Sequence, residues 1–271
     1  MGDSRTAGQR GGGAETAMPC MWRLWIDEMP RPGWTNMAID HALLERAERQ
    51  GESWLRLYQW APHCLSFGRH EPAQLRYDAA QISARGIDTV RRPTGGRAVW
   101  HAEELTYSIA TPYSPFGTLK AAYLEIHQML AGAMQTLGVA VSLADSVGTP
   151  PLDSGPCFAQ PAGGEIMLRG RKVVGSAQLR CGTALLQHGS VLLQDSQHVV
   201  RELMKEDRPP GRLPHPVEPW AQARDVADAI IAAASRRWEG EWEPGTDEAA
   251  LLEEASIHYP HYSSAAWTWS R

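Results

Sequence analysis

The sequence predicts an α+β fold in which helices pack against a mostly antiparallel β-sheet. Strand-like runs outnumber helical segments along the chain, and several consecutive runs are separated only by short turns. Short turns can join antiparallel strands, whereas parallel strands need a long crossover connection. With 271 residues and a hydrophobic content of 43%, the chain is long enough to bury a substantial core.

The strand-like runs share alternating apolar residues or β-branched residues bounded by turn residues. In chain order they are residues 22–29, 54–60, 64–69, 87–90, 97–101, 105–110, 139–144, 165–168, 173–179 and 184–193. Short turns predict three hairpins among these runs. The hairpins join 54–60 to 64–69 across an Ala-Pro-His turn, 97–101 to 105–110 through Ala102-Glu103-Glu104, and 165–168 to 173–179 through Arg169-Gly170-Arg171-Lys172.

The helical segments carry apolar residues three and four positions apart. They are residues 34–50, 77–85, 119–137, 196–205 and 221–238. The first has Thr35 or Asn36 as its expected N-cap, and Gly86 and Gly138 are expected to end the second and third. The expected buried stripe of the third and longest helix is Tyr123, Ile126, Leu130, Met134 and Leu137.

The two ends of the chain differ from its middle. Residues 1–20 are rich in glycine and polar residues without apolar periodicity, so we expect a disordered extension before a single domain over residues 21–271. Residues 206–220 have the proline density of a linker or flap, followed by a helical C-terminal segment. Four late tryptophans suggest packing against the main body or a lid over a pocket: Trp238, Trp242, Trp267 and Trp269.

Composition excludes several classes of function. The net charge of −5 argues against a broad nucleic-acid footprint, so we expect no nucleic-acid partner. No apolar run approaches the ~18 residues of a membrane span, and no secretory leader opens the sequence. We therefore expect a cytoplasmic protein without a membrane segment.

The four cysteines lie far apart, with no C-x-x-C pair and no spacing of histidines that would make a zinc site. They are Cys20, Cys64, Cys157 and Cys181. We expect no metal centre, and each cysteine is either a small buried hydrophobic residue or a nucleophile. Ser66 lacks the preceding glycine of a hydrolase nucleophile elbow, so it is expected to pack rather than to catalyse.

A glycine turn after residues 87–90 predicts a binding loop. Arg91 and Arg92 enter a Pro-Thr-Gly-Gly turn, in which Gly95 and Gly96 permit positive φ and let backbone N–H groups approach a ligand. Because side chains alternate along a strand, the two arginines point to opposite faces. Only one of them is therefore expected to enter the site.

The stretch RRPTGGRAVWHAEELTYS, residues 91–108, resembles a signature of the lipoate and octanoate branch of the biotin and lipoate protein ligase superfamily. A second block agrees with it: Cys157-Phe158, GRKVVGSAQ at residues 170–178 and LQHGS at residues 186–190. Together they resemble the cysteine-dependent octanoyltransferases, from about residue 22 to about residue 203. The resemblance implies the catalytic-domain fold of that superfamily. It also implies octanoyl transfer from octanoyl-acyl carrier protein to a lysine of a lipoyl domain, such as the glycine cleavage H protein or a 2-oxoacid dehydrogenase E2.

The resemblance assigns catalytic roles to Cys157 and Lys172. Cys157 would carry the acyl group as a thioester, and Lys172 would lie beside it and favour the thiolate. One thioester replaces another in this step, so no ATP and no cofactor are expected. Phe158, next in the chain, would line an apolar slot for the acyl chain.

Substrate-binding roles follow from the same two blocks. Arg91, Arg92 and Arg97 would bind the phosphopantetheine phosphate or the acidic carrier protein, and Gly95 and Gly96 would present backbone to the acyl carbonyl. The remaining residues expected to line the site are His101, Gly175, Ser176, Ala177, His188 and Gly189. The two histidines among them are expected to form the pocket wall and not to act as general bases.

Three alternatives remain open. An ATP-dependent lipoate-protein ligase would share the fold, although such ligases typically have three glycines where this sequence has Gly95-Gly96-Arg97, and they typically lack the cysteine. An amidotransferase would move the acyl group between lipoyl domains, also through a cysteine. A non-enzymatic module would bind a carrier protein and keep a structural cysteine. Ala102 and Ala162-Gly163-Gly164 depart from the family pattern, which leaves the chain-length preference open.

Overall fold

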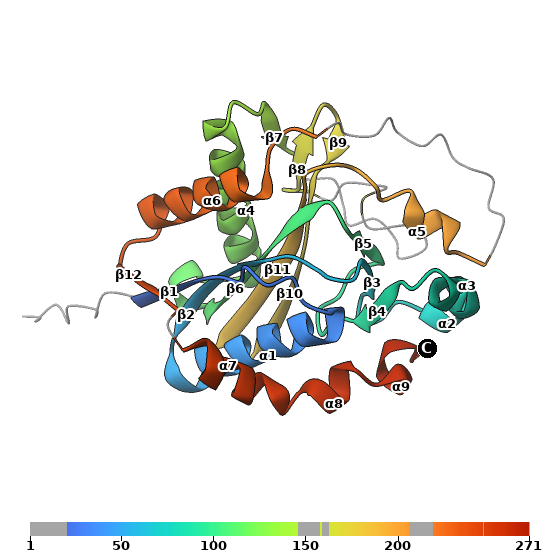
Figure 1. Ribbon diagram of the computed structural model, residues 1–271. Coiled ribbons are helices and arrows are strands. Elements are labelled where there is room, and N and C mark those ends of the chain that lie inside the picture. The colour runs from blue at the N-terminus through green and yellow to red at the C-terminus, as the bar shows by residue number, and fades with distance from the viewer. Residues whose placement is uncertain (1–20, 146–157, 159–162, 206–218, 246, 271) are drawn as a thin grey trace, which may run out of the picture.

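The computed structural model describes residues 21–145, 158, 163–205, 219–245 and 247–270, and its centre is a six-stranded sheet (Figure 1). In spatial order the strands are β10 (Val174–Cys181), β11 (Ala184–Leu192), β6 (Glu104–Pro112), β2 (Ser53–Tyr58), β1 (Met21–Ile26) and β12 (Glu241–Pro244). The pairings from β10 to β2 are antiparallel, and those of β2 with β1 and of β1 with β12 are parallel. The predicted α+β class with a mostly antiparallel sheet is confirmed.

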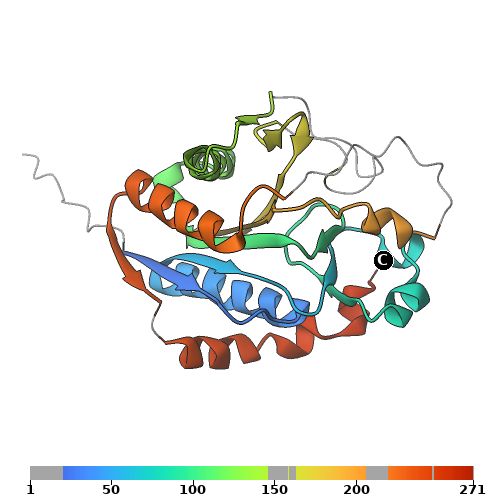
Figure 2. The same cartoon turned by 45° about the horizontal axis from the view of Figure 1, so that its top comes forward.

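Helices cover both faces of this sheet (Figures 1 and 2). On one face α4 (Leu119–Thr136) and α6 (Ala223–Arg237) pack over buried strand residues such as Tyr107 and Ile109. On the other face lies α1 (Gly33–Gln50). Three C-terminal helices extend along the outer side of α1 and beyond it, namely α7 (Glu248–Ser256), α8 (Tyr259–Tyr262) and α9 (Ala265–Thr268).

Two small sheets and four short helices complete the described structure. One sheet has the order β4 (Asp88–Arg91), β3 (Cys64–Phe67) and β5 (Val99–His101). The other has the order β7 (Val141–Leu143), β8 (Ile166–Leu168) and β9 (Arg171–Lys172). The short helices are α2 (Ala73–Arg76), α3 (Ala79–Ala84), η1 (Ser114–Phe116) and α5 (Val199–Glu202). Among the described helices, none has an apolar stretch long enough to span a membrane.

The hairpin predictions are wrong for two of the three pairs. Strand β3 pairs with β4 and β5, not with β2. Strand β5 likewise belongs to the small sheet, although only two residues separate it from β6. The reason is that β6 is a nearly fully buried central strand whose two edges are taken by β2 and β11, so it has no free edge for β5.

The third hairpin prediction is partly right. Strand β8 pairs with β9 through a tight turn at Arg169 and Gly170, which have φ values of 51° and 76°. The chain after Val173 then leaves this hairpin and forms β10. Along β11 it pairs over eight residue positions, a far longer ladder than the short β8 could offer.

The helix boundaries also correct the prediction. Thr35 and Asn36 lie inside the first turn of α1 and do not cap it, and the preceding Pro32 makes no side-chain cap. Instead the carboxylate of Asp88 accepts a hydrogen bond of 2.7 Å from the backbone N–H of Gly33. A cap that comes from 55 residues away cannot be seen in the local sequence.

The predicted helix 77–85 corresponds to α3 alone, which begins after its N-cap Asp78, and the separate helix α2 ends before the extended Tyr77. Gly86 and Gly138 have positive φ directly after α3 and α4, as expected for helix ends. In the predicted stripe of α4, Tyr123 is only half-buried and Leu137 is exposed; the buried members are Ile126, Leu130 and Met134.

The four late tryptophans all pack against the main body. Trp238 and Trp242 stack with Trp22 at ring-centroid distances of 4.7 and 5.2 Å. Trp267 donates its indole N–H to the carbonyl of Arg91, and Trp269 packs on Phe67. The expected N-terminal extension and nearly all of the proline-rich segment lie outside the described residues.

Candidate active site

A cavity of about 40 Å³ lies between the glycine loop after β4 and the strands β10 and β11. Eight residues expected from the sequence line it: Arg92, Gly96, His101, Gly175, Ser176, Ala177, His188 and Gly189. The lining residues that the sequence analysis missed are Met37, Tyr58, Trp60, Val99, Thr106 and Ser190. Segments far apart in the sequence therefore meet at one site.

Arg92 enters this cavity, whereas Arg91 does not. The guanidinium of Arg91 is fully buried and donates hydrogen bonds to main-chain carbonyls of Gly68 and Glu71, and also to those of Trp267 and Ser270 in the C-terminal segment. Its geometry is that of a structural residue that ties two segments together. The alternation of side chains along β4 thus separates the two arginines as the sequence indicated.

Arg92 belongs to a buried hydrogen-bonded chain. Its guanidinium donates to Ser66 Oγ and to the carbonyl of Arg97, 2.5 and 2.7 Å away, and so fixes the ends of the glycine loop. Ser66 Oγ is also 2.5 Å from His101 Nε2, and His101 Nδ1 is 2.7 Å from Glu104 Oε1. Burial lowers the pKa of His101 more than the Glu104 carboxylate raises it. The neutral ring therefore accepts from Ser66 and donates to Glu104.

His188 lies between a carboxylate and a hydroxyl. Its Nδ1 is 2.8 Å from Asp40 Oδ2 and its Nε2 is 2.7 Å from Thr94 Oγ1. Burial alone would raise the pKa of the Asp40 carboxyl, but the hydrogen bond from His188 and the charge of Arg56 outweigh it and lower that pKa. Asp40 is therefore an ionised acceptor, which orients the His188 ring toward Thr94 in the glycine loop.

A third buried chain ends at Ser176 in the cavity wall. His127 Nδ1 donates to the carbonyl of Gly164 at 2.7 Å, so Nε2 accepts from Ser176 Oγ at 2.8 Å. Ser176 in turn accepts from the hydroxyl of Tyr107 at 2.6 Å, and Tyr107 accepts from Gln187. Burial lowers the pKa of His127 to about 4 and thereby keeps the ring neutral.

Lys172 is buried and is not a solvated turn residue. Its Nζ donates to Glu165 Oε1 at 2.5 Å and lies 5.1 Å from the ring centroid of Phe158. A Cβ on Gly175 would lie 2.7 Å from Phe158 Cζ and 3.3 Å from Lys172 Cε. The lysine, the phenylalanine and the cavity wall are therefore in direct contact, and a side chain at position 175 would force the Phe158 ring to shift.

The remaining expected residues lie around this centre. Gly95 is half-buried, and Gly96 has a φ of 91°, as the loop requires. The backbone of Arg97 is fixed by Arg92, and its side chain does not line the cavity. Cys157 lies outside the described residues.

Several site residues had only weak signals in the sequence. Asp40 and His127 are polar positions within the apolar faces of α1 and α4, and such an interruption could have marked them. Glu104 and Thr106 stand inside the recognised motif but had no assigned role. Glu165 precedes a short strand and has no local signal at all.

Comparison with known proteins places this arrangement in a family. The model of the lipoyl protein ligase A/B catalytic domain matches residues 32–226. The octanoyltransferase LipM of Carboxydothermus hydrogenoformans is 42% identical over 177 residues, which cover 64% of this chain and 65% of that protein. This chain thus aligns with just under two thirds of the length of that relative.

A second relative matches over more of its length. The octanoyltransferase LipM of Kyrpidia tusciae is 38% identical over 212 residues, covering 73% of this chain and 77% of that protein. Among solved structures, lipoate-protein ligase A bound with ATP superposes with a TM-score of 0.71 at 17% identity, over 93% of this chain and 99% of that one. At that identity the likeness concerns the fold alone. The family model and the sequence relatives together show that the chain belongs to the lipoyl protein ligase A/B catalytic domain family.

Proposed function

We propose that this protein is an octanoyltransferase of the cytoplasm. It moves an octanoyl group from octanoyl-acyl carrier protein to a lysine of a lipoyl domain, such as the glycine cleavage H protein or a 2-oxoacid dehydrogenase E2. Support comes from the relatives named octanoyltransferase LipM and from the cavity lined by both sequence motifs.

The observation that carries the proposal is the buried Lys172 beside Phe158. Cys157 directly precedes Phe158 in the sequence, so we infer that its thiol comes close to the ammonium of Lys172. A nearby cation favours the thiolate over the thiol, which a cysteine nucleophile requires. Glu165 fixes the position of the ammonium through their 2.5 Å contact.

The proposed reaction has two steps. The Cys157 thiolate attacks the carbonyl of the donor thioester, an acyl–cysteine thioester forms, and the carrier's phosphopantetheine thiol is released. The lysine amine of the lipoyl domain then attacks that thioester, an amide forms and the Cys157 thiol is regenerated. Neither step needs ATP, because the donor thioester is already activated.

The test is intact-mass spectrometry of the protein mixed with octanoyl-acyl carrier protein. We expect the mass of one octanoyl group, labile to hydroxylamine, in the wild type and no adduct in Cys157→Ala. An adduct that persists in Cys157→Ala, or no adduct in the wild type, would overturn the covalent mechanism. Two further donors separate the alternatives in the same assay: acylation of a lipoyl domain from octanoate only with ATP indicates a ligase, and transfer only from an octanoylated lipoyl domain indicates an amidotransferase.

A further inference from the structure

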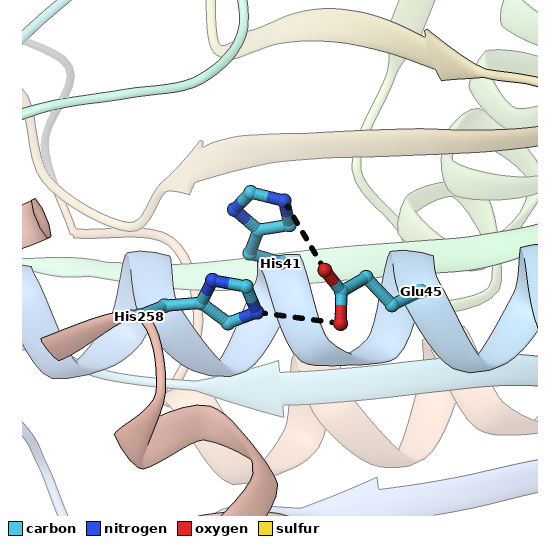
Figure 3. A group of neighbouring side chains, drawn as sticks. All are labelled: His41, Glu45 and His258. Carbon is cyan, nitrogen blue, oxygen red and sulfur yellow. Dashed lines mark ion pairs between the residues drawn. The ribbon is translucent and has the colours of Figure 1, made fainter.

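A second cluster of reactive side chains lies outside the cavity, where the C-terminal segment crosses α1 (Figure 3). His41 and Glu45 are one helical turn apart on α1 and share a face, and His258 comes from the link between α7 and α8. One nitrogen or oxygen atom of each residue lies within 4.8 Å of the others. His41 Nε2 is 3.9 Å from Glu45 Oε1, and His258 Nε2 is 3.5 Å from Glu45 Oε2.

These two contacts are too long for strong hydrogen bonds. His258 Nε2 is buried and has no hydrogen-bond partner among the residues that the structure describes. A buried polar nitrogen without a partner is costly, so its position opposite a carboxylate calls for a third group between them. A metal ion is such a group.

The two histidine rings stack with their centroids 4.0 Å apart and their planes 7° apart, and the Nε2 atom of each lies opposite the Glu45 carboxylate (Figure 3). Because the lone pair of Nε2 lies in the plane of its ring, at least one ring must rotate out of the stack for both nitrogens to bind one ion. The hydroxyl of Tyr262 lies 3.0 Å from His41 Nδ1, and a hydrogen bond to the nitrogen that does not bind the metal is common for metal-binding histidines.

We propose that His41, Glu45 and His258 form a binding site for a divalent transition-metal ion, with zinc as the best fit. Two imidazole nitrogens and one carboxylate oxygen are a common ligand set for zinc, and a water molecule would complete the tetrahedron. Ligand atoms about 2.1 Å from a tetrahedral ion lie roughly 3.4 Å from each other. The separations of 3.5 and 3.9 Å, which run to the two different oxygens of Glu45, exceed this value by at most about half an ångström. Since the three ligand atoms lie within 4.8 Å of one another, no separation among them needs to contract by more than about 1.4 Å.

The site would join two parts of the molecule. His258 belongs to the segment that continues into α8 and α9, and the carbonyls of Trp267 and Ser270 after it accept hydrogen bonds from Arg91. A bound ion would hold this segment against α1. One existing contact competes, because the exposed Arg49 donates to Glu45 Oε2 at 3.0 Å and must move aside or share that oxygen.

The experiment is a calorimetric titration of the full chain with Zn²⁺, with Mg²⁺ as the ion that should not compete. We expect one site whose affinity falls about 100-fold or more in His258→Ala and in Glu45→Gln, since even a supporting residue of a metal site is worth 10- to 100-fold. Glu45→Gln can still accept from Arg49 and retains the size of the side chain, so it tests the site if His258→Ala does not fold.

The chain offers a matched control in His198. It faces Glu202 one turn away on α5 at 3.8 Å, like the pair on α1, but the described residues place no third ligand beside it. His198→Ala should leave zinc affinity unchanged. Zinc could instead bind to the cysteines, and the absorption spectrum of the protein with Co²⁺ distinguishes the two kinds of site. A site with only nitrogen and oxygen ligands gives d–d absorption without a sulfur charge-transfer band. Three results would overturn the proposal. They are the absence of a saturable Zn²⁺ site, a wild-type affinity for Zn²⁺ in both His258→Ala and Glu45→Gln, and a sulfur charge-transfer band that disappears when the cysteines are alkylated.

A second measurement tests whether the bound ion holds the C-terminal segment against α1. Zn²⁺ should slow proteolytic cleavage within residues 257–270 of the wild type and leave the rate in His258→Ala unchanged. Equal protection of both proteins would mean that the ion acts elsewhere.

Discussion

At the scale of single residues, the buried pair of Lys172 and Glu165 decides how the lysine can act. A solvated turn lysine could be replaced at a cost within about 0.5 kcal/mol. Removing one partner of a buried ion pair instead leaves an uncompensated charge, at a cost of about 3–5 kcal/mol. The 2.5 Å contact and the low exposure place Lys172 in the second class.

We predict that Lys172→Ala loses both stability and activity. Urea unfolding should show a loss of about 3–5 kcal/mol, and octanoyl transfer should slow on the order of 10²-fold or more. The pH profile of iodoacetamide alkylation at Cys157 should move to higher pH, because the thiolate loses its cation.

Lys172→Arg is the control for that prediction. It keeps the charge and should recover most of the stability, but its larger planar group should restore little of the transfer rate. An unchanged alkylation profile with near-normal transfer in Lys172→Ala would remove Lys172 from the site.

We predict that the protein loses stability in acid because His127 is buried in its neutral form. Its pKa falls from the ordinary 6.5 to about 4 on folding because the ring is buried. Between these two pH values His127 is protonated in the unfolded state but neutral in the folded state. The free energy of unfolding is therefore unaffected by protonation of this group above pH 6.5 and decreases as the pH falls toward 4. The shift corresponds to a loss on the order of 3 kcal/mol.

The measurement is the free energy of unfolding in urea at pH 7 and at pH 4.5, in the wild type and in His127→Gln. Gln does not titrate, so the variant should be less stable at pH 7 but should lose less on acidification. His41 has a similar shift and should keep part of the slope in both proteins. Equal acid losses would show that folding does not shift the pKa of His127.

At the scale of elements, the close approach of β10 and β11 sets the wall of the cavity. A Cβ on Gly189 would lie 2.5 Å from the carbonyl oxygen of Gly175, which is backbone and cannot turn aside. Gly132 in α4 is a matched control, because a Cβ there would meet nothing within 4 Å. The same substitution should therefore have opposite effects at the two positions.

We predict that Gly189→Ala destabilises the protein by about 1–3 kcal/mol, as forced overpacking does. Gly132→Ala should stabilise it by up to about 1 kcal/mol through the higher helix propensity of alanine. Thermal unfolding measures both changes. A Gly189→Ala variant as stable as the wild type would mean that β10 and β11 can separate at no cost.

The same elements show what local sequence can and cannot predict. Most strands and long helices lie within a few residues of their expected positions, because their patterns are local. Pairing is not local: β5 leaves β6 only because β2 and β11 already occupy both edges of β6. The two motifs likewise revealed Arg92, His101 and His188, but not their partners.

Two of those partners come from distant parts of the chain. Asp40 is 148 residues from His188, and Ser66 is 35 residues from His101. The cluster of His41, Glu45 and His258 was equally hidden, since more than 200 residues separate the two histidines. No spacing rule for metal sites covers such a distance.

At the scale of the whole molecule, Arg91 connects the glycine loop to the C-terminal segment. Its guanidinium donates to carbonyls on both sides of this junction, and the indole of Trp267 donates back to the Arg91 carbonyl. Position 91 is therefore where the small sheet, the loop and α9 are held together. A lysine at this position keeps the charge but cannot reach both sets of carbonyls at once.

We predict that Arg91→Lys costs roughly 3 kcal/mol, because several buried carbonyls lose charge-assisted donors. It should also speed hydrogen exchange selectively in residues 264–270, while exchange in α4 rises only by the amount that global destabilisation gives to every slow amide. Arg85→Lys is the control: its partner Glu202 is exposed, and surface pairs of this kind contribute about 0–1 kcal/mol. Exchange in residues 264–270 that stays at the wild-type rate in Arg91→Lys would mean that the C-terminal segment is held to the body without the Arg91 guanidinium, by contacts such as the packing of Trp269 on Phe67 and the hydrogen bond from the Trp267 indole to the Arg91 carbonyl.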